Sequence, residues 1–177
     1  TTLNNLAVVQ RALGSYAAAS ASYERALAIG EAALGPDHPS VATTLNNLGL
    51  LYLTQGIYPQ SQSAFERALK IRRAALGPQH IEVATTLNNL GYLQYIRGAL
   101  GEAQELLEQA LAIREADLGP DHRDVATTLS NLGLVSLTRG DTEGARTRFK
   151  RAFAIRERGL TPGHPGMASI YNNLGVL

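Results

Sequence analysis

The chain has 177 residues, of which 45% are hydrophobic and 18% are charged, and its formal net charge is +1. This composition is typical of a folded chain and excludes an intrinsically disordered or fibrous one. The nearly balanced charge implies neither a nucleic acid nor an anionic membrane as partner. Cysteine is absent, which excludes a disulfide framework, a thiolate metal site and a cysteine nucleophile.

Asparagine recurs five times at a spacing of 42 residues, at Asn5, Asn47, Asn89, Asn131 and Asn173. An internal period of this length indicates a solenoid or another array of repeated supersecondary units. The copies are residues 1–42, 43–84, 85–126 and 127–168, and residues 169–177 begin a fifth. We therefore expect a single repeat array over residues 1–177, stabilised by burial between neighbouring repeats, and a fragment of a longer protein.

The first half of each copy predicts an amphipathic helix. Each copy opens with a version of Thr-Thr-Leu-Asn-Asn-Leu-Gly, as in residues 43–49, and its leucines follow helical spacing. A glycine lies in the same place in every copy and predicts a left-handed cap and a tight turn. These glycines are Gly14, Gly56, Gly98 and Gly140.

The second half of each copy predicts a second helix, in which small residues allow close approach and bulky residues fill the space between helices. The small residues are Ala26, Ala68, Ala110 and Ala152, and the bulky ones are Tyr23, Phe65, Leu107 and Phe149. Leu-Gly-Pro predicts the end of this helix at residues 34–36, 76–78 and 118–120. In the fourth copy the segment is Leu-Thr-Pro-Gly at residues 160–163, so we expect a looser or shifted turn there.

These residues carry a resemblance over the whole chain. The pattern of Leu48, Gly49, Tyr52, Gly56, Tyr58, Phe65 and Ala68 resembles the tetratricopeptide repeat. The 42-residue period and the linker at residues 34–39 are similar to the repeats of kinesin light chains. The resemblance implies an all-α fold, a right-handed α-solenoid of helix-turn-helix repeats, whose first helices line a concave groove.

The resemblance also implies that the asparagine row faces this groove. A side-chain amide offers a donor and an acceptor, so it can pair with a peptide unit of a ligand whatever the ligand's sequence. Alternatively, each amide ties its own helix to a neighbour, and the two roles can coexist. The preceding residues in the copies, Asn4, Asn46, Asn88 and Asn172, are expected to be exposed in the groove, since Ser130 replaces asparagine in the fourth copy.

Residues farther along the first helices vary between copies, and we expect them to set specificity for a ligand. They are Val8, Arg11, Leu50, Leu53, Tyr92, Tyr95, Leu134 and Leu137. Their mostly apolar and aromatic character favours a ligand with hydrophobic anchors. The alternative is that several of them are buried between helices.

The four histidines, His38, His80, His122 and His164, share one repeat position. Successive ones lie a whole repeat apart, whereas ligands that share one zinc lie within about 4 Å of each other. We therefore expect structural histidines at the starts of helices, and no metal or other cofactor.

The six basic residues between Arg146 and Arg158 lie on a second helix, and a solvated helix face is favoured over a nucleic-acid site. The chain lacks a phosphate-binding loop, a His-Glu-x-x-His motif and a distinct Ser, His and Asp set. We expect no enzyme and no catalytic residue.

The predicted function is a protein-interaction module that binds an extended or partly helical peptide in the groove. The alternative is a structural or regulatory arm of a larger protein, such as an NLR-like signalling ATPase, or a self-associating scaffold. Uncapped termini would allow end-to-end association. No apolar run approaches the ~20 residues of a membrane-spanning helix, so no membrane partner is expected. The chain shows no signal-peptide pattern, which leaves open a targeting segment upstream of residue 1, and a cytoplasmic location is expected.

Overall fold

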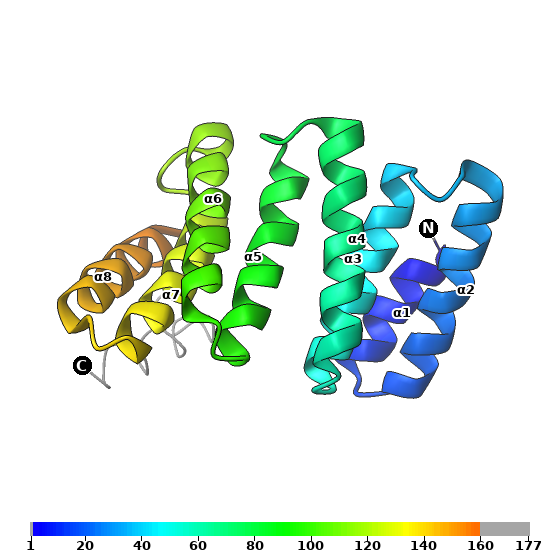
Figure 1. Ribbon diagram of the computed structural model, residues 1–177, viewed down its shortest axis with the longest axis horizontal. Helices are drawn as coiled ribbons and strands as arrows, with labels where there is room; N and C mark the ends of the chain where they lie inside the picture. Colours follow the sequence, from blue (N-terminus) through cyan, green and yellow to red (C-terminus); the bar gives the residue numbers. More distant parts are fainter. Residues whose placement is uncertain (1, 160–177) are drawn as a thin grey trace. The chain divides into compact units, whose positions relative to one another are not determined.

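In the computed structural model, residues 2–159 are described, and every regular element among them is an α-helix (Figure 1). The helices are α1 (Thr2–Ala12), α2 (Tyr16–Leu34), α3 (Pro39–Thr54), α4 (Tyr58–Leu76), α5 (Ile81–Ile96), α6 (Leu100–Leu118), α7 (Arg123–Thr138) and α8 (Thr142–Gly159). The bounds of α3, α5 and α7 repeat every 42 residues, as do those of α2, α4 and α6. The predicted all-α repeat fold is confirmed.

Glycines form the helix ends where the sequence predicts them. Gly56, in the turn between α3 and α4, has a φ of +75°, and Gly77, which caps α4, has a φ of +87°. An L-residue with a β-carbon is strained at such angles, so glycine is the residue that ends the helix there. The altered cap expected at residues 160–163 lies outside the described residues.

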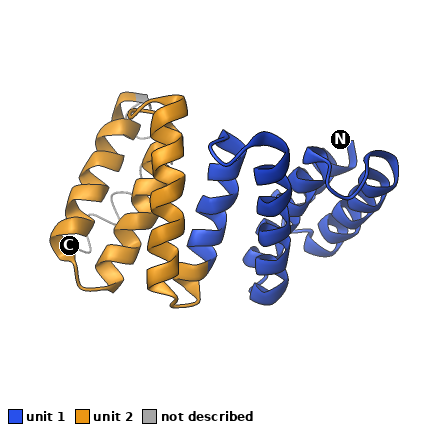
Figure 2. Cartoon of the chain, turned by 45° about the horizontal axis from the view of Figure 1, so that its top comes forward, with its two compact units in different colours: residues 1–93 blue, residues 94–177 orange. Residues whose placement is uncertain are grey.

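The chain divides into two compact units, Thr1–Leu93 and Gln94–Leu177, and the boundary falls inside α5 (Figure 2). Within the first unit, α1 packs against α2 and α3 packs against α4 (Figure 1). Within the second, α7 packs against α8 and α6 packs against α7. The predicted pairs α1–α2 and α3–α4 therefore lie in the first unit and the pair α7–α8 in the second, whereas the boundary inside α5 divides the third predicted pair.

The core of each unit lies both within helix pairs, as where Val41 and Leu45 of α3 pack on Ala68 and Ile71 of α4, and between neighbouring pairs. In the first unit, Leu48 and Leu51 of α3 pack on Ala7, Ala19 and Tyr23 of the preceding pair. In the second, Leu132 and Val135 of α7 pack on Ala103 and Leu107 of α6. The predicted bulky residues of the second helices, Tyr23, Phe65, Leu107 and Phe149, are all fully buried.

Two glycines of first helices lie directly under phenylalanine rings. A β-carbon added to Gly49 of α3 would lie 2.7 Å from the Phe65 ring of α4, and one added to Gly133 of α7 would clash with the Phe149 ring of α8 in the same way. No ordinary carbon pair approaches that closely. The phenylalanine therefore rests directly on the backbone of the first helix in both pairs.

Candidate functional site

Side-chain amides of neighbouring first helices are paired in the unit formed by residues 1–93. Asn47 Nδ2 of α3 donates to Asn4 Oδ1 of α1 at 3.4 Å, and Asn89 Nδ2 of α5 donates to Asn46 Oδ1 of α3 at 3.1 Å. In each pair, the donor belongs to the predicted row of one copy. The acceptor is the first asparagine of the Asn-Asn pair in the previous copy. The row links first helices to one another, as the structural alternative predicts.

The preceding asparagines are less accessible than the sequence suggested. Asn46 is 5% exposed and Asn88 is 6% exposed, so the expectation that they are exposed in a groove is wrong. Consecutive residues on a helix point about 100° apart, and in α3 and α5 the first asparagine of each pair turns into the space between helices. In the fourth copy Ser130 Oγ donates to Ala126 O of its own helix at 2.9 Å.

The asparagines of the row remain accessible. Asn5 is exposed, and Asn47, Asn89 and Asn131 are half-buried; Asn172 and Asn173 lie outside the described residues. A primary amide has two N–H donors and an oxygen with two lone pairs. The bond to the preceding copy engages one N–H of Asn47 and of Asn89, and it fixes the plane of each amide.

The row lies on one uncharged face of each first helix. On α3 this face consists of Thr43, Asn47, Leu50 and Thr54, at successive spacings of four, three and four residues. All four are half-buried or exposed, whereas Leu45, Leu48 and Leu51 on the opposite side are buried. We call this surface the amide face. On α5 it is Thr85, Asn89, Tyr92 and Ile96, and on α7 it is Thr127, Asn131, Leu134 and Thr138.

The predicted specificity residues are all at least partly accessible. Val8 is 38% exposed, and Arg11, Leu50, Leu53, Tyr92, Tyr95, Leu134 and Leu137 are half-buried. Tyr95 packs against the buried cluster of Leu107, Leu132 and Val135, so it contributes to packing as well.

Arg11 lies beside a buried tyrosine. Burial raises the pKa of the Tyr23 hydroxyl above its ordinary value, and the nearby Arg11 guanidinium lowers it in part. Arg11 itself is half-buried and its Nε is buried, so only part of this side chain is accessible to a ligand.

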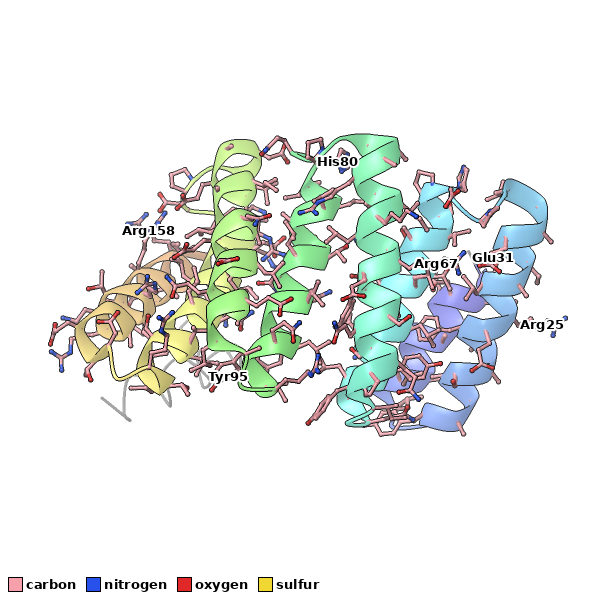
Figure 3. All side chains as sticks on the ribbon, viewed as in Figure 1. Arg25, Glu31, Arg67, His80, Tyr95 and Arg158 are labelled. Atoms are coloured by element: carbon pink, nitrogen blue, oxygen red, sulfur yellow. The ribbon has the colours of Figure 1, made fainter. Side chains whose placement is uncertain are left out.

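The histidines cap helices, as the sequence predicts. His38 Nδ1 accepts a hydrogen bond from the Ser40 backbone N–H at 3.2 Å, and His80 Nδ1 accepts from that of Glu82 at 3.2 Å. His122 Nδ1 accepts from the Asp124 backbone N–H at 3.1 Å. Each imidazole thus satisfies an N–H that the helix itself leaves without a partner. His80 lies in the linker before α5 (Figure 3), and His164 lies outside the described residues.

Two buried arginines, which the sequence reasoning missed, join successive copies. Arg72 NH1 donates to Glu82 O at 3.0 Å and to Thr86 Oγ1 at 2.7 Å. Arg72 NH2 lies 3.4 Å from Thr43 Oγ1, and Nε lies 3.3 Å from a Glu82 carboxylate oxygen. Burial lowers the pKa of Arg72, and Glu82 acts in the opposite direction.

Arg114 repeats this arrangement in the second unit. Its NH1 donates to Asp124 O at 2.9 Å and to Thr128 Oγ1 at 2.6 Å, and burial lowers its pKa while Asp124 opposes the change. We call each of these arginine sites a guanidinium clasp. The sequence signal was an arginine at the same repeat position, with a carboxylate ten residues later.

The basic residues of α8 make more contacts than a solvated face would. Arg151 pairs with Glu115 at 2.6 Å and donates to Pro120 O, and Arg148 NH1 donates to Ser136 Oγ at 2.9 Å. These two residues therefore contact neighbouring helices, while 41% of the Arg151 side chain remains exposed to solvent. Arg67 and Glu31 form the same second-helix bridge in the first unit, at 2.6 Å (Figure 3).

Possible metal ligands do not converge in the described part of the chain. Within residues 2–159, no three His, Asp or Glu side chains gather so as to hold a metal ion. Across the same residues, no helix is long and apolar enough to cross a membrane.

Comparisons with known proteins place the repeats in a family. The family model described as the tetratricopeptide repeat matches residues 1–74, 55–116, 97–158 and 124–177, which together span the chain. No curated protein matches the chain.

Solved structures share the fold. BtubC (BKLC) from P. vanneervenii is 31% identical with a TM-score of 0.79, and the match covers 91% of this chain but 65% of that one. Two crystal structures of a putative kinesin light chain from Podosopora anserina, with nearly identical repeats, are each 23% identical, with TM-scores of 0.81 and 0.79. Each covers 99% of this chain, and 82% and 83% of those chains.

Proposed function

This chain belongs to the tetratricopeptide repeat family, with repeats of the kinesin-light-chain-like type, and we propose that its amide face binds an extended peptide segment of another protein. The family is generally one of protein–protein interaction modules. The observation that carries the proposal is the fixed and accessible amide of Asn47 and Asn89.

The fixed amides suit a peptide backbone. Each amide already holds its plane through the bond to the preceding copy, so little side-chain entropy is lost when a ligand binds. Its Oδ1 and second N–H then match the N–H and C=O of one peptide unit. An extended ligand offers such groups, whereas a helical ligand uses them internally.

The spacing of the row supports a periodic contact. Packed helices lie 8–10 Å apart, and an extended chain advances ~3.3 Å per residue. One amide of the row would therefore meet roughly every third ligand residue. In the unit formed by residues 1–93, Asn5, Asn47 and Asn89 would engage about seven ligand residues.

The other residues of the amide face indicate which kind of side chain the ligand would carry. Leu50 and Tyr92 lie one turn from their asparagines, and the flanking positions are mostly threonines. The face on α3 and α5 has no charged residue. It therefore favours a ligand with apolar anchors over one that is selected by charge.

Peptide selection followed by alanine substitution tests the proposal. A binding peptide selected from an unbiased library would be titrated against the wild type, Asn47→Ala and Asn89→Ala. We expect an affinity loss of about 5- to 10-fold for each, the value of one hydrogen bond. Gln60→Ala, which removes an exposed amide from the second helix α4, is the matched control. Equal affinities for all four chains would refute the proposal.

A further inference from the structure

The two fixed amides of the row set an interval that a ligand has to match. Asn47 of α3 and Asn89 of α5 belong to successive first helices of the unit formed by residues 1–93, and each is held by the first asparagine of the preceding copy. Packed helices lie about 8–10 Å apart. Neither amide can turn away without breaking its bond, so the ligand has to present two equivalent backbone groups about 8–10 Å apart.

A β-strand does not meet this interval with one of its edges. Its residues advance ~3.3 Å each, and the backbone N–H and C=O groups of successive residues point to opposite edges. Groups on one edge therefore recur after two residues, about 6.6 Å, or after four residues, about 13 Å. Three residues span about 10 Å, but they bring the opposite edge of the strand to the second amide.

A polyproline II helix does meet the interval. It has three residues per turn and rises ~3.1 Å per residue, so the same side of its backbone returns after about 9.3 Å. It makes no internal hydrogen bonds, and its backbone groups are therefore available to side-chain amides. Only one residue in three has to offer an N–H to the row, so proline, which has none, is allowed at the other two positions.

The hydrogen-bond donors of the amide face suit one contact per copy. On α3, Thr43 Oγ1 and Thr54 Oγ1 donate to carbonyls of their own helix, at 3.3 and 2.9 Å, and Leu50 has no polar side-chain group. Among these four described residues, Asn47 is therefore the one that keeps a side-chain N–H for a ligand. One such donor per copy matches one ligand carbonyl in every three residues.

The remaining surface of the amide face suits proline rings. Leu50 and Tyr92 are half-buried, and the face on α3 and α5 carries no charge. Polyproline II segments are commonly held by grooves of this apolar and aromatic kind. A proline-rich segment is also already ordered before it binds, because proline fixes φ, so it loses little conformational entropy.

We propose that the amide face of α3 and α5 binds a polyproline II segment of a partner protein, with a non-proline residue at every third position. This inference rests on the proposed function and specifies its ligand. The second N–H of Asn47 and of Asn89 would donate to ligand carbonyls three residues apart, and each Oδ1 would accept the N–H of a non-proline residue. The proline rings would lie against Leu50 and Tyr92.

Two synthetic peptides of equal composition test the spacing. In acetyl-(Leu-Pro-Pro)3-Leu-amide the leucine N–H groups recur every three residues, and in acetyl-(Leu-Pro)4-Pro-Pro-amide they recur every two. In NMR titrations of the ¹⁵N-labelled chain, the first should bind at least about fivefold more tightly, because it alone reaches Asn47 and Asn89 together. For Asn89→Ala this preference should fall below about twofold. Equal affinity of the two peptides for the wild type, or no binding of either, would overturn the proposal.

A glycine peptide tests the conformation of the ligand. Acetyl-(Leu-Gly-Gly)3-Leu-amide keeps the period of three but has no fixed φ, so it should bind at least about tenfold more weakly than the first proline peptide. Binding of the glycine peptide as tight as that of the proline peptide would contradict a preformed polyproline II helix. Gln60→Ala, on the second helix α4, should keep the preferences of the wild type.

The same titrations separate this inference from the proposed function. If the three synthetic peptides bound alike while a library-selected peptide still lost affinity on Asn47→Ala and Asn89→Ala, the amide face would hold a ligand backbone in another conformation. Only the polyproline II inference would then fail. If the two substitutions left the affinity of the selected peptide unchanged as well, the proposed function would fail with it.

Discussion

Asn89 Nδ2 donates to Asn46 Oδ1 at 3.1 Å, so that an accessible amide on α5 is held by a buried amide on α3. This pair divides the two asparagines of the repeat into different roles. The buried member ties neighbouring first helices together, and the accessible member keeps further hydrogen-bonding groups at the surface.

Substitution of the two members should have unequal effects on stability. Asn46→Ala removes the acceptor of Asn89 and leaves a small buried space, so we expect it to lower the free energy of unfolding by about 1–3 kcal/mol. Asn89→Ala removes one partly accessible bond and should lower it by about 1 kcal/mol or less. Urea denaturation measures both. A larger cost for Asn89→Ala than for Asn46→Ala would contradict the division of roles.

Gly49→Ala should destabilise the chain although alanine favours helix. The new β-carbon would lie 2.7 Å from the Phe65 ring, and such overpacking costs about 1–3 kcal/mol, of which about 1 kcal/mol is offset by helix propensity. Phe65→Leu, which copies Leu107 from the same repeat position, should relieve the clash. A double-mutant cycle by thermal denaturation checks this, and strictly additive effects would show that the ring does not limit the site.

Arg72→Ala should be among the more damaging substitutions on a second helix. It removes the buried guanidinium that donates to the Thr86 hydroxyl and to the Glu82 carbonyl, and we expect a loss of about 2–4 kcal/mol in the free energy of unfolding. The control is Lys70→Ala, which truncates an exposed cation of the same helix. Equal effects of the two substitutions would show that the clasp does not stabilise the array.

Tyr23→Phe should make stability less sensitive to alkaline pH. The pKa of Tyr23 is raised above 10.0 by burial, so the folded chain keeps the phenolic proton that the unfolded chain releases. The stability that this provides is complete below about pH 10 and is lost as pH rises through the folded-state pKa. The free energies of unfolding of the wild type and Tyr23→Phe, measured by denaturation at pH 8 and pH 11, show the contribution of the Tyr23 hydroxyl. If the two free energies differed by the same amount at both pH values, this expectation would be contradicted.

Local signals were sufficient to predict the helices. Gly56 and Gly77 end their helices with positive φ, and His38, His80 and His122 begin theirs, because both roles depend on the backbone of a few adjacent residues. Phe65 and Phe149 were predicted to fill the interhelical space for a similar reason, since size at a fixed repeat position indicates packing.

It was harder to predict from the sequence which side chains point toward a neighbouring copy of the repeat. Asn46 and Asn47 are adjacent and chemically identical, and only the position of the next helix decides which of them is buried. The clasp of Arg72 was not predicted because arginine normally indicates a solvated surface and because Gly30 interrupts the column of arginines. A second-helix arginine paired with an acidic residue in the following linker is the pattern that would have revealed it.

The most direct test of ligand binding by the amide row combines Asn89→Ala with N-methylation of single backbone amides along a selected peptide ligand. If Asn89 Oδ1 accepts a ligand backbone N–H, one N-methyl position should weaken binding to the wild type about fivefold or more, the value of one hydrogen bond. The same position should change binding to Asn89→Ala by less than about twofold, because the shared contact is already lost. If every N-methyl position weakened binding to both chains equally, the amide row would serve to join helices and would not hold the ligand backbone.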